Sequence, residues 1–293
     1  QERVTLVTTF DALMNTMAPI EKMWENVLTL ELGQLLDLKE IQAALIRMGY
    51  EKEYQVQTMG QFSVRGGILD VFPLTEENPI RIELWGDEID TIRYFDCESQ
   101  KSIENIDRVS IYPAAELVLS DEEKAGGIDK LKAEAKRVSD KLRKQMKTEE
   151  AHRVTVMADE LTEEWGELSM YAGMEAFFSY FFDESVGLLD YFKPSDSLIF
   201  FDELTRCVEQ GKLTETEFSE SMKQRLALGY ILPGQMNGLF TEKEIVAKLE
   251  KYSCIALGAL DNKANGLHQL GSYGILCQSV SPYNNSFALL IKD

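Results

Sequence analysis

The sequence predicts an α/β protein that carries a small α+β unit within its chain. Three observations favour this fold class. Short β-like runs cluster between residues 37 and 115, and apolar runs alternate with helical stretches further on. A length of 293 residues is enough for two domains or for one large domain that carries an insertion. With 44% hydrophobic and 10% aromatic residues, the chain has enough apolar surface to offset the entropy lost on folding, which predicts a globular protein.

The chain opens on an apolar, β-rich run at residues 4–9, which predicts a strand. A helix-like segment from Phe10 to Met17 follows, and then Pro19. Because there is no initial methionine, we expect a fragment whose upstream part is missing. Residues 1–36 are then the end of the first part of a larger α/β domain.

A helix is predicted at residues 38–48. Asp37 followed by Glu40 is the pattern of a capping box, and Gly49 is a typical residue at a helix C-terminus. The apolar residues between these ends recur at helical spacing: Leu38, Ile41, Leu45 and Met48.

Four β-like runs follow this helix, at residues 61–72, 80–85, 88–95 and 106–112. In the third run the apolar residues recur at every third position, which predicts a β-bulge. Gly66-Gly67 interrupts the first run and marks either a bulge or a close backbone approach. The helix and the strands together predict a compact α+β unit over residues 37–115.

The residues of the second run alternate, and they define a candidate binding surface. With the period of two of a strand, Arg81, Glu83 and Trp85 share the face that points away from the core. Arg65 alternates in the same way on the first run, so strand pairing would bring a second guanidinium to this face. Two interpretations stay open. Either Arg and Trp form a binding hot spot, or Trp85 covers an edge of the core and the arginines pair with neighbouring glutamates.

Residues 120–150 are charged and helical in composition, with eight Lys or Arg residues between Lys130 and Lys147. This segment is either a phosphate-binding helix or a solvated helix face. The net charge of −20 argues against DNA binding by the chain as a whole. Further on, apolar runs alternate with helical stretches, which favours a parallel α/β layer: 153–157, 197–201, 253–257 and 274–280.

An apolar strand that ends in Asp202 and Glu203 is a feature of many NTPases. Such enzymes also need a Gly-rich loop and a Lys that hold the phosphates, and the sequence contains no GxxxxGK[ST] motif. We therefore expect no ATP hydrolysis by this chain, and we interpret the two acids as a solvated strand end.

The cysteines are scattered without a CxxC pair, so we expect neither a metal site nor disulfides: Cys97, Cys207, Cys254 and Cys277. The sequence has no run of 18 apolar residues and no signal-like start. We therefore expect no membrane association and an intracellular location.

Two stretches of the predicted α+β unit resemble a known family. They are GQFSVRGGILDVFP at residues 60–73 and IRIELWGDEID at residues 80–90. Both closely resemble the domain that UvrB shares with the transcription-repair coupling factors (Mfd), and the resemblance continues at residues 188–192, 197–203 and 226–233. UvrB has Asp-Glu-Ser-His where this chain has Asp-Glu-Leu-Thr at residues 202–205. That departure, together with residues 65–70 and 281–287, favours the coupling factors over UvrB.

The resemblance implies a helicase-like α/β domain, RecA-like and UvrB-like, made of residues 1–36 and 116–280. An insert domain at residues 37–115 would interrupt it and dock UvrA, and residues 281–293 would lead to a following domain. The implied function is a non-catalytic module with a degenerate ATPase site, which recruits UvrA in nucleotide excision repair of transcribed DNA. The alternative is a fragment of a UvrB-like ATPase.

The resemblance also implies partners and contact residues. No cofactor is expected in this chain. ATP, RNA polymerase and DNA would bind other parts of a longer, cytoplasmic bacterial protein. Carried over by motif position, the UvrA contacts are Arg65, Arg81 and Trp85, with Trp85 at a position where related proteins can have Phe. Charge reversal at Arg81 is expected to abolish binding without unfolding the module.

Overall fold

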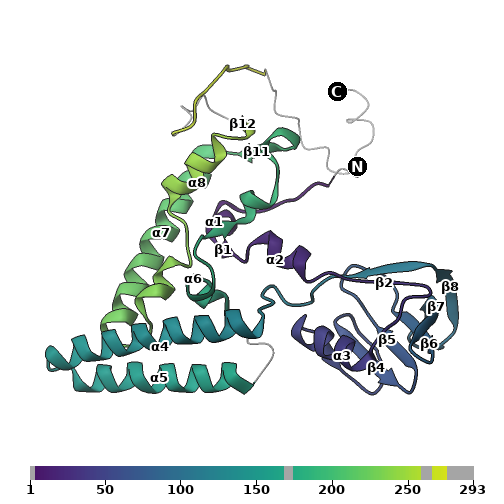
Figure 1. Cartoon of the computed structure of the whole chain (residues 1–293). Helices are drawn as coiled ribbons and strands as arrows, with labels where there is room; N and C mark the ends of the chain where they lie inside the picture. The colour runs from purple at the N-terminus through teal and green to yellow at the C-terminus, as the bar shows by residue number, and fades with distance from the viewer. Residues whose placement is uncertain (1–3, 168–173, 259–265, 276–293) are drawn as a thin grey trace, which may run out of the picture.

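The computed structural model describes residues 4–167, 174–258 and 266–275. Figure 1 shows two parts: an α+β unit built from β2 to β9 and α3, and a part built around long helices and a small parallel sheet. The chain passes from the second part into the α+β unit after α2 and returns to it before α4. The elements of the α+β unit therefore lie in the chain between α2 and α4.

The α+β unit consists of one helix, α3 (Leu38–Arg47), and a six-stranded sheet of order β3-β4-β5-β6-β7-β8. Neighbouring strands are antiparallel except β3 and β4, which are parallel. The helix packs on one face of the sheet around a core that includes Leu45, Phe62 and Ile82. The strand bounds are β3 Glu51–Lys52, β4 Gln61–Arg65, β5 Ile68–Val71, β6 Ile80–Trp85, β7 Glu88–Phe95 and β8 Ser102–Ile106.

The predicted first run is a hairpin rather than one strand. Gly66 and Gly67 form the loop between β4 and β5, and Gly66 has a φ of +61°. A Cβ atom at Gly67 would lie 3.2 Å from the carbonyl oxygen of Leu84, so the predicted close backbone approach is confirmed. The predicted bulge in β7 is also confirmed, because the register shifts by one residue where Leu84 pairs with Ile89.

A second small sheet extends the unit toward the N-terminus. Strand β2 (Leu28–Glu31) pairs antiparallel with β9 (Arg108–Ile111), and Leu30 is fully buried in the same core. The pairing brings residues 28–31 into the unit, upstream of the predicted start at residue 37. Strand β8 was not predicted because four of its five residues are exposed, which leaves no alternating apolar pattern.

The other part contains the predicted parallel strands β11 (Leu198–Asp202) and β12 (Ser253–Leu257), which pair with each other. One face of this pair packs against three helices, α1 (Phe10–Met14), α7 (Leu204–Ala227) and α8 (Glu242–Leu249). The other face carries exposed apolar side chains: Leu198, Phe200, Ile255 and Leu257.

The charged segment forms a helical hairpin of α4 (Asp121–Lys144) and α5 (Thr148–Glu167), seen along the lower edge of Figure 1. A capping box between Ser120 and Glu123 starts α4. The hairpin packs on α6 (Phe178–Phe181) through a core that includes the buried Trp165. The remaining short elements are α2 (Ile20–Glu25) and the antiparallel pair β1 (Thr16–Met17) and β10 (Val186–Gly187).

Two predicted strands are wrong. Residues 153–157 lie in α5, because Ala151, Val154 and Ala158 are buried at helical spacing against α4. Residues 4–9 have no regular secondary structure and are exposed. The predicted strand at residues 274–280 lies mostly outside the described residues, as does the predicted linker at residues 281–293. In the described part of the chain, no helix has the length and apolar composition needed to cross a membrane.

Gly229, which follows α7, allows a test of this packing. Its φ is +73°, and a Cβ atom there would lie 2.6 Å from the carbonyl oxygen of Glu150. We expect Gly229→Ala to lower the free energy of unfolding by about 1 to 3 kcal/mol, measured by urea denaturation. The control is Gly126→Ala within α4, where a Cβ atom meets nothing within 4 Å and a small stabilisation is expected. Equal stability of the two variants would contradict the close contact.

Candidate functional site

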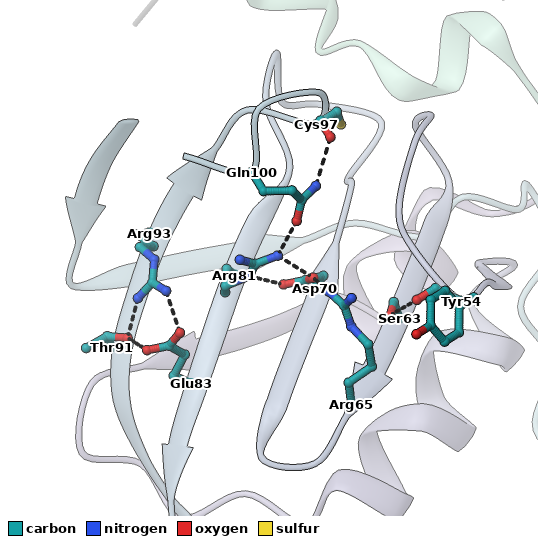
Figure 2. Close-up of polar contacts among 10 residues, drawn as sticks. All are labelled: Tyr54, Ser63, Arg65, Asp70, Arg81, Glu83, Thr91, Arg93, Cys97 and Gln100. Carbon is teal, nitrogen blue, oxygen red and sulfur yellow. Dashed lines mark hydrogen bonds and ion pairs between the residues drawn. The ribbon is translucent and has the colours of Figure 1, made fainter. Parts of the chain in front are cut away.

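The face of the sheet opposite α3 carries a group of polar side chains, which we call the polar face: Ser63, Arg65, Asp70, Arg81, Glu83 and Arg93. Figure 2 shows them on β4 to β7. Their neighbours in the sequence, such as Phe62, Leu69 and Ile82, point into the core. The period of two predicted for the second run is therefore confirmed, and it holds for the adjacent strands as well.

Asp70 is the centre of the polar face. Its carboxylate oxygen Oδ1 accepts a hydrogen bond of 2.6 Å from Nε of Arg81. Oδ2 accepts bonds of 2.8 Å from Nη2 of Arg81 and 2.9 Å from Nη2 of Arg65. The side chain of Asp70 is only 2% exposed. The strand register explains this arrangement, because Asp70 on β5 lies directly opposite Arg81 on β6.

Arg81 is held on several sides, so the structure makes it a part of the scaffold. Its Nη2 donates a second bond of 2.8 Å to Oε1 of Gln100, and its guanidinium lies 4.3 Å from the ring centroid of Phe95. The side chain is 13% exposed. The hydrogen bonds to Asp70 raise the pKa of Arg81, which keeps the guanidinium charged. A buried, bidentate ion pair of this kind fixes the geometry of both partners.

Arg65 is the more accessible guanidinium, since its side chain is 38% exposed. One bond to Asp70 fixes its position, and the guanidinium has further N–H groups that can donate to a partner. Arg65 and Arg81 thus both bind the carboxylate of Asp70. They lie on one face of the sheet, as expected if their strands belong to the same sheet. Their roles differ, because only Arg65 presents much of its surface to solvent.

A second ion pair lies next to the first. Arg93 on β7 pairs with Glu83 on β6 and donates a bond of 3.1 Å to the hydroxyl of Thr91. The hydrogen bond from Arg93 holds the pKa of Glu83 below its usual value. Glu83 is therefore ionised at neutral pH and neutralises Arg93 rather than Arg81.

Trp85 ends β6 and is 84% exposed. The interpretation in which it covers an edge of the core is therefore wrong. Strand alternation places it on the same side of the sheet as Arg81 and Glu83, so Trp85 is an exposed aromatic member of the polar face. Leu35, which is also exposed, forms a β-bridge with Glu88, the residue that pairs with Trp85.

Sequence reasoning missed three residues of this site: Asp70, Gln100 and Arg93. Asp70 lies within the quoted motif, and its polar position in an apolar run was the available signal. No local pattern identifies Gln100, because its role depends on a φ of +58° and a loop that brings it back over β6.

The other candidate positions lie away from the polar face. Asp202 ends β11 and is exposed, while Glu203 has a φ of +56° and precedes α7. The carbonyl oxygen of Asp202 accepts a hydrogen bond of 3.3 Å from the thiol of Cys207. In the described residues, no group of three or more His, Cys, Asp or Glu side chains is arranged to hold a metal ion.

All eight basic residues between Lys130 and Lys147 are exposed along α4 and the turn after it. Three of them form ion pairs, which join Lys130 to Asp183, Arg137 to Glu134, and Arg143 to Asp140. Exposed, partly paired basic residues are what a solvated helix face would show. Binding of this segment to nucleic acid stays a prediction. It would show as an affinity for duplex DNA that falls steeply as salt rises.

The comparisons with known proteins agree with this architecture. The model of the UvrB interaction domain family matches residues 28–117, which include β2, β9 and the whole polar face. These residues therefore belong to the UvrB interaction domain family.

Relatives extend the similarity beyond this domain. A transcription-repair-coupling factor of Bacillus subtilis is 31% identical over 250 residues, which are 85% of this chain and 21% of that protein. One from Staphylococcus aureus is 32% identical over 237 residues, 78% of this chain and 19% of that protein. The chain spans about a fifth of the length of these relatives. It is thus a homologue of one segment of the transcription-repair-coupling factors.

Proposed function

We propose that this chain recruits UvrA in the nucleotide excision repair of transcribed DNA, through the polar face of its UvrB interaction domain. One observation carries the proposal. An exposed indole, Trp85, and a partly exposed guanidinium, Arg65, project from the same side of a well-packed sheet. Large aromatic and Arg side chains dominate binding energy at protein interfaces.

The rigidity of the polar face supports this role. Asp70 and Arg81 fix the guanidinium of Arg65, so little side-chain entropy remains to be lost when a partner binds. We propose that Arg65 and Trp85 contact UvrA directly, and that Arg81 contributes mainly by holding Asp70. This modifies the expectation that all three residues contact UvrA directly.

We further propose that the chain is not an enzyme and binds no nucleotide. The part around β11 and β12 would belong to a helicase-like α/β domain, which is supported by the exposed apolar face of these strands. Parallel sheets are normally covered on both faces. The longer protein would be a cytoplasmic, ATP-dependent DNA translocase that acts on RNA polymerase through other domains.

The proposal is tested by titrating the chain with UvrA, using the wild type and Arg65→Glu. We expect binding by the wild type and a loss of affinity of at least tenfold for the variant, because a carboxylate at residue 65 would lie beside Asp70 and repel acidic groups of the partner. Far-UV circular dichroism checks that the variant is folded. Absence of binding by the folded wild-type chain would contradict the proposed function.

A further inference from the structure

Tyr54 is an exposed aromatic residue at the edge of the polar face. It is 82% exposed. It follows β3, the strand beside β4, and neither the family motifs nor the alternation of β6 points to it. A Tyr side chain offers a large, amphipathic contact area at a low cost in conformational entropy, and one on a fixed backbone has the least entropy to lose on binding.

The backbone around Tyr54 is fixed by β4. The amide of Glu53 donates a hydrogen bond of 2.8 Å to the carbonyl oxygen of Phe62. The hydroxyl of Ser63, a residue that is only 1% exposed, donates a bond of 2.9 Å to the carbonyl oxygen of Tyr54. Figure 2 shows this contact at the edge of the sheet. The buried hydroxyl of Ser63 thus fixes the backbone of Tyr54, whose side chain is exposed.

The ring of Tyr54 lies beside Arg65. Cζ of the guanidinium is 6.0 Å from the ring centroid, near the outer limit for a cation–π contact. On its other side Arg65 is bound to Asp70. The guanidinium is therefore positioned from two sides, with Tyr54 on the solvent-facing edge.

Trp85 lies on β6, two strands from Arg65 on β4 and on the side away from β3. Strand pairing aligns Arg65 with Ile68, and Ile68 with Glu83, and Trp85 follows two residues after Glu83 on the same face. In the order of the strands, the accessible charge of Arg65 therefore lies between Tyr54, which follows β3, and Trp85 on β6, and Tyr54 is the one in contact with it. A carboxylate surrounded by apolar groups is the chemical complement of such an arrangement.

We propose that Tyr54 and Arg65 form a composite contact that takes a carboxylate of the partner, with Tyr54 as a second aromatic contact in addition to Trp85. This inference rests on the proposed function, in which the partner is UvrA. The ring packs on the apolar surround of the carboxylate, while the free N–H groups of Arg65 donate to its oxygens.

The test is a titration of the full chain with UvrA, using Tyr54→Ala and Tyr54→Phe. We expect affinity about tenfold weaker for Tyr54→Ala and within about twofold of wild type for Tyr54→Phe, because the ring is the contact. The matched control is Tyr230→Ala, which removes another exposed tyrosine with an arginine, Arg153, at 4.3 Å from its ring centroid. This control should bind as the wild type does.

The carboxylate is tested by the salt dependence of binding. Arg65→Gln should flatten it, whereas Tyr54→Ala should leave its slope unchanged. If Tyr54→Ala binds as tightly as the wild type while Arg65→Glu does not bind, the inference is overturned and the proposed function stands. If the wild type itself does not bind UvrA, the proposed function fails and the inference fails with it.

Discussion

Arg81→Glu is expected to unfold the UvrB interaction domain rather than to remove a contact from its surface. The variant would leave Asp70, which is 2% exposed, without its bidentate partner and would place a second carboxylate beside it. Removing one member of a buried ion pair costs about 3 to 5 kcal/mol, a large share of the stability of a small domain. The measurement is urea denaturation, followed by hydrogen exchange at the amides of β5 and β6.

Arg65→Gln is the matched control, because it removes the other guanidinium at the same carboxylate. Arg65 is more exposed and supplies one hydrogen bond, so we expect a loss of about 1 kcal/mol or less. Arg81→Glu with the urea midpoint of the wild type would refute the structural role of Arg81. That result would instead support the prediction from the sequence, in which charge reversal at Arg81 abolishes binding without unfolding the domain.

Trp85→Ala is expected to weaken UvrA binding by about thirtyfold or more and to leave stability unchanged. Truncation of a central aromatic anchor typically costs 2 kcal/mol or more in binding, and about 1.4 kcal/mol corresponds to tenfold. Trp85 is 84% exposed, so its removal leaves no cavity in the core. Calorimetric titration against UvrA, together with urea denaturation, separates the two effects.

Trp24→Ala is the control for this prediction. Trp24 is also exposed, but it lies on α2, outside the UvrB interaction domain, and its ring contacts Tyr112 edge to face. We expect affinity within about twofold of the wild type. If both tryptophan variants lose affinity equally, the binding surface is not confined to the polar face.

Much of the UvrB interaction domain could be predicted from sequence, because its strands alternate and its turns are marked by glycines. The period of two in residues 80–85 places Arg81, Glu83 and Trp85 on one face, and the structure confirms it. The start of α3 at Asp37 was also predicted, although its carboxylate accepts from the amide of Lys39 rather than from that of Glu40.

The ion-pair network could not be predicted, because it depends on register between strands. Asp70 meets Arg81 only because β5 and β6 pair with these two residues opposite each other. Gln100 reaches Arg81 through a loop with a left-handed backbone conformation. A single sequence contains no signal for either arrangement, and without them Arg65 and Arg81 look equivalent.

The two wrong strand predictions have different causes. Residues 153–157 contain β-branched side chains that suggest a strand, yet Val154 is buried at helical spacing against α4. Here the tertiary contact of two helices outweighs local propensity. The run at residues 4–9 has the composition of a strand, but a strand also needs a neighbour with which to pair.

Hydroxyl-radical footprinting of the chain with saturating UvrA shows whether the polar face binds UvrA, because it reports the solvent access of individual side chains. We expect strong protection of Trp85 in the complex, with Trp24 and Tyr230 as reactive as in the free chain. A complex in which Trp85 keeps its full reactivity would contradict the assignment of the polar face as the surface that binds UvrA.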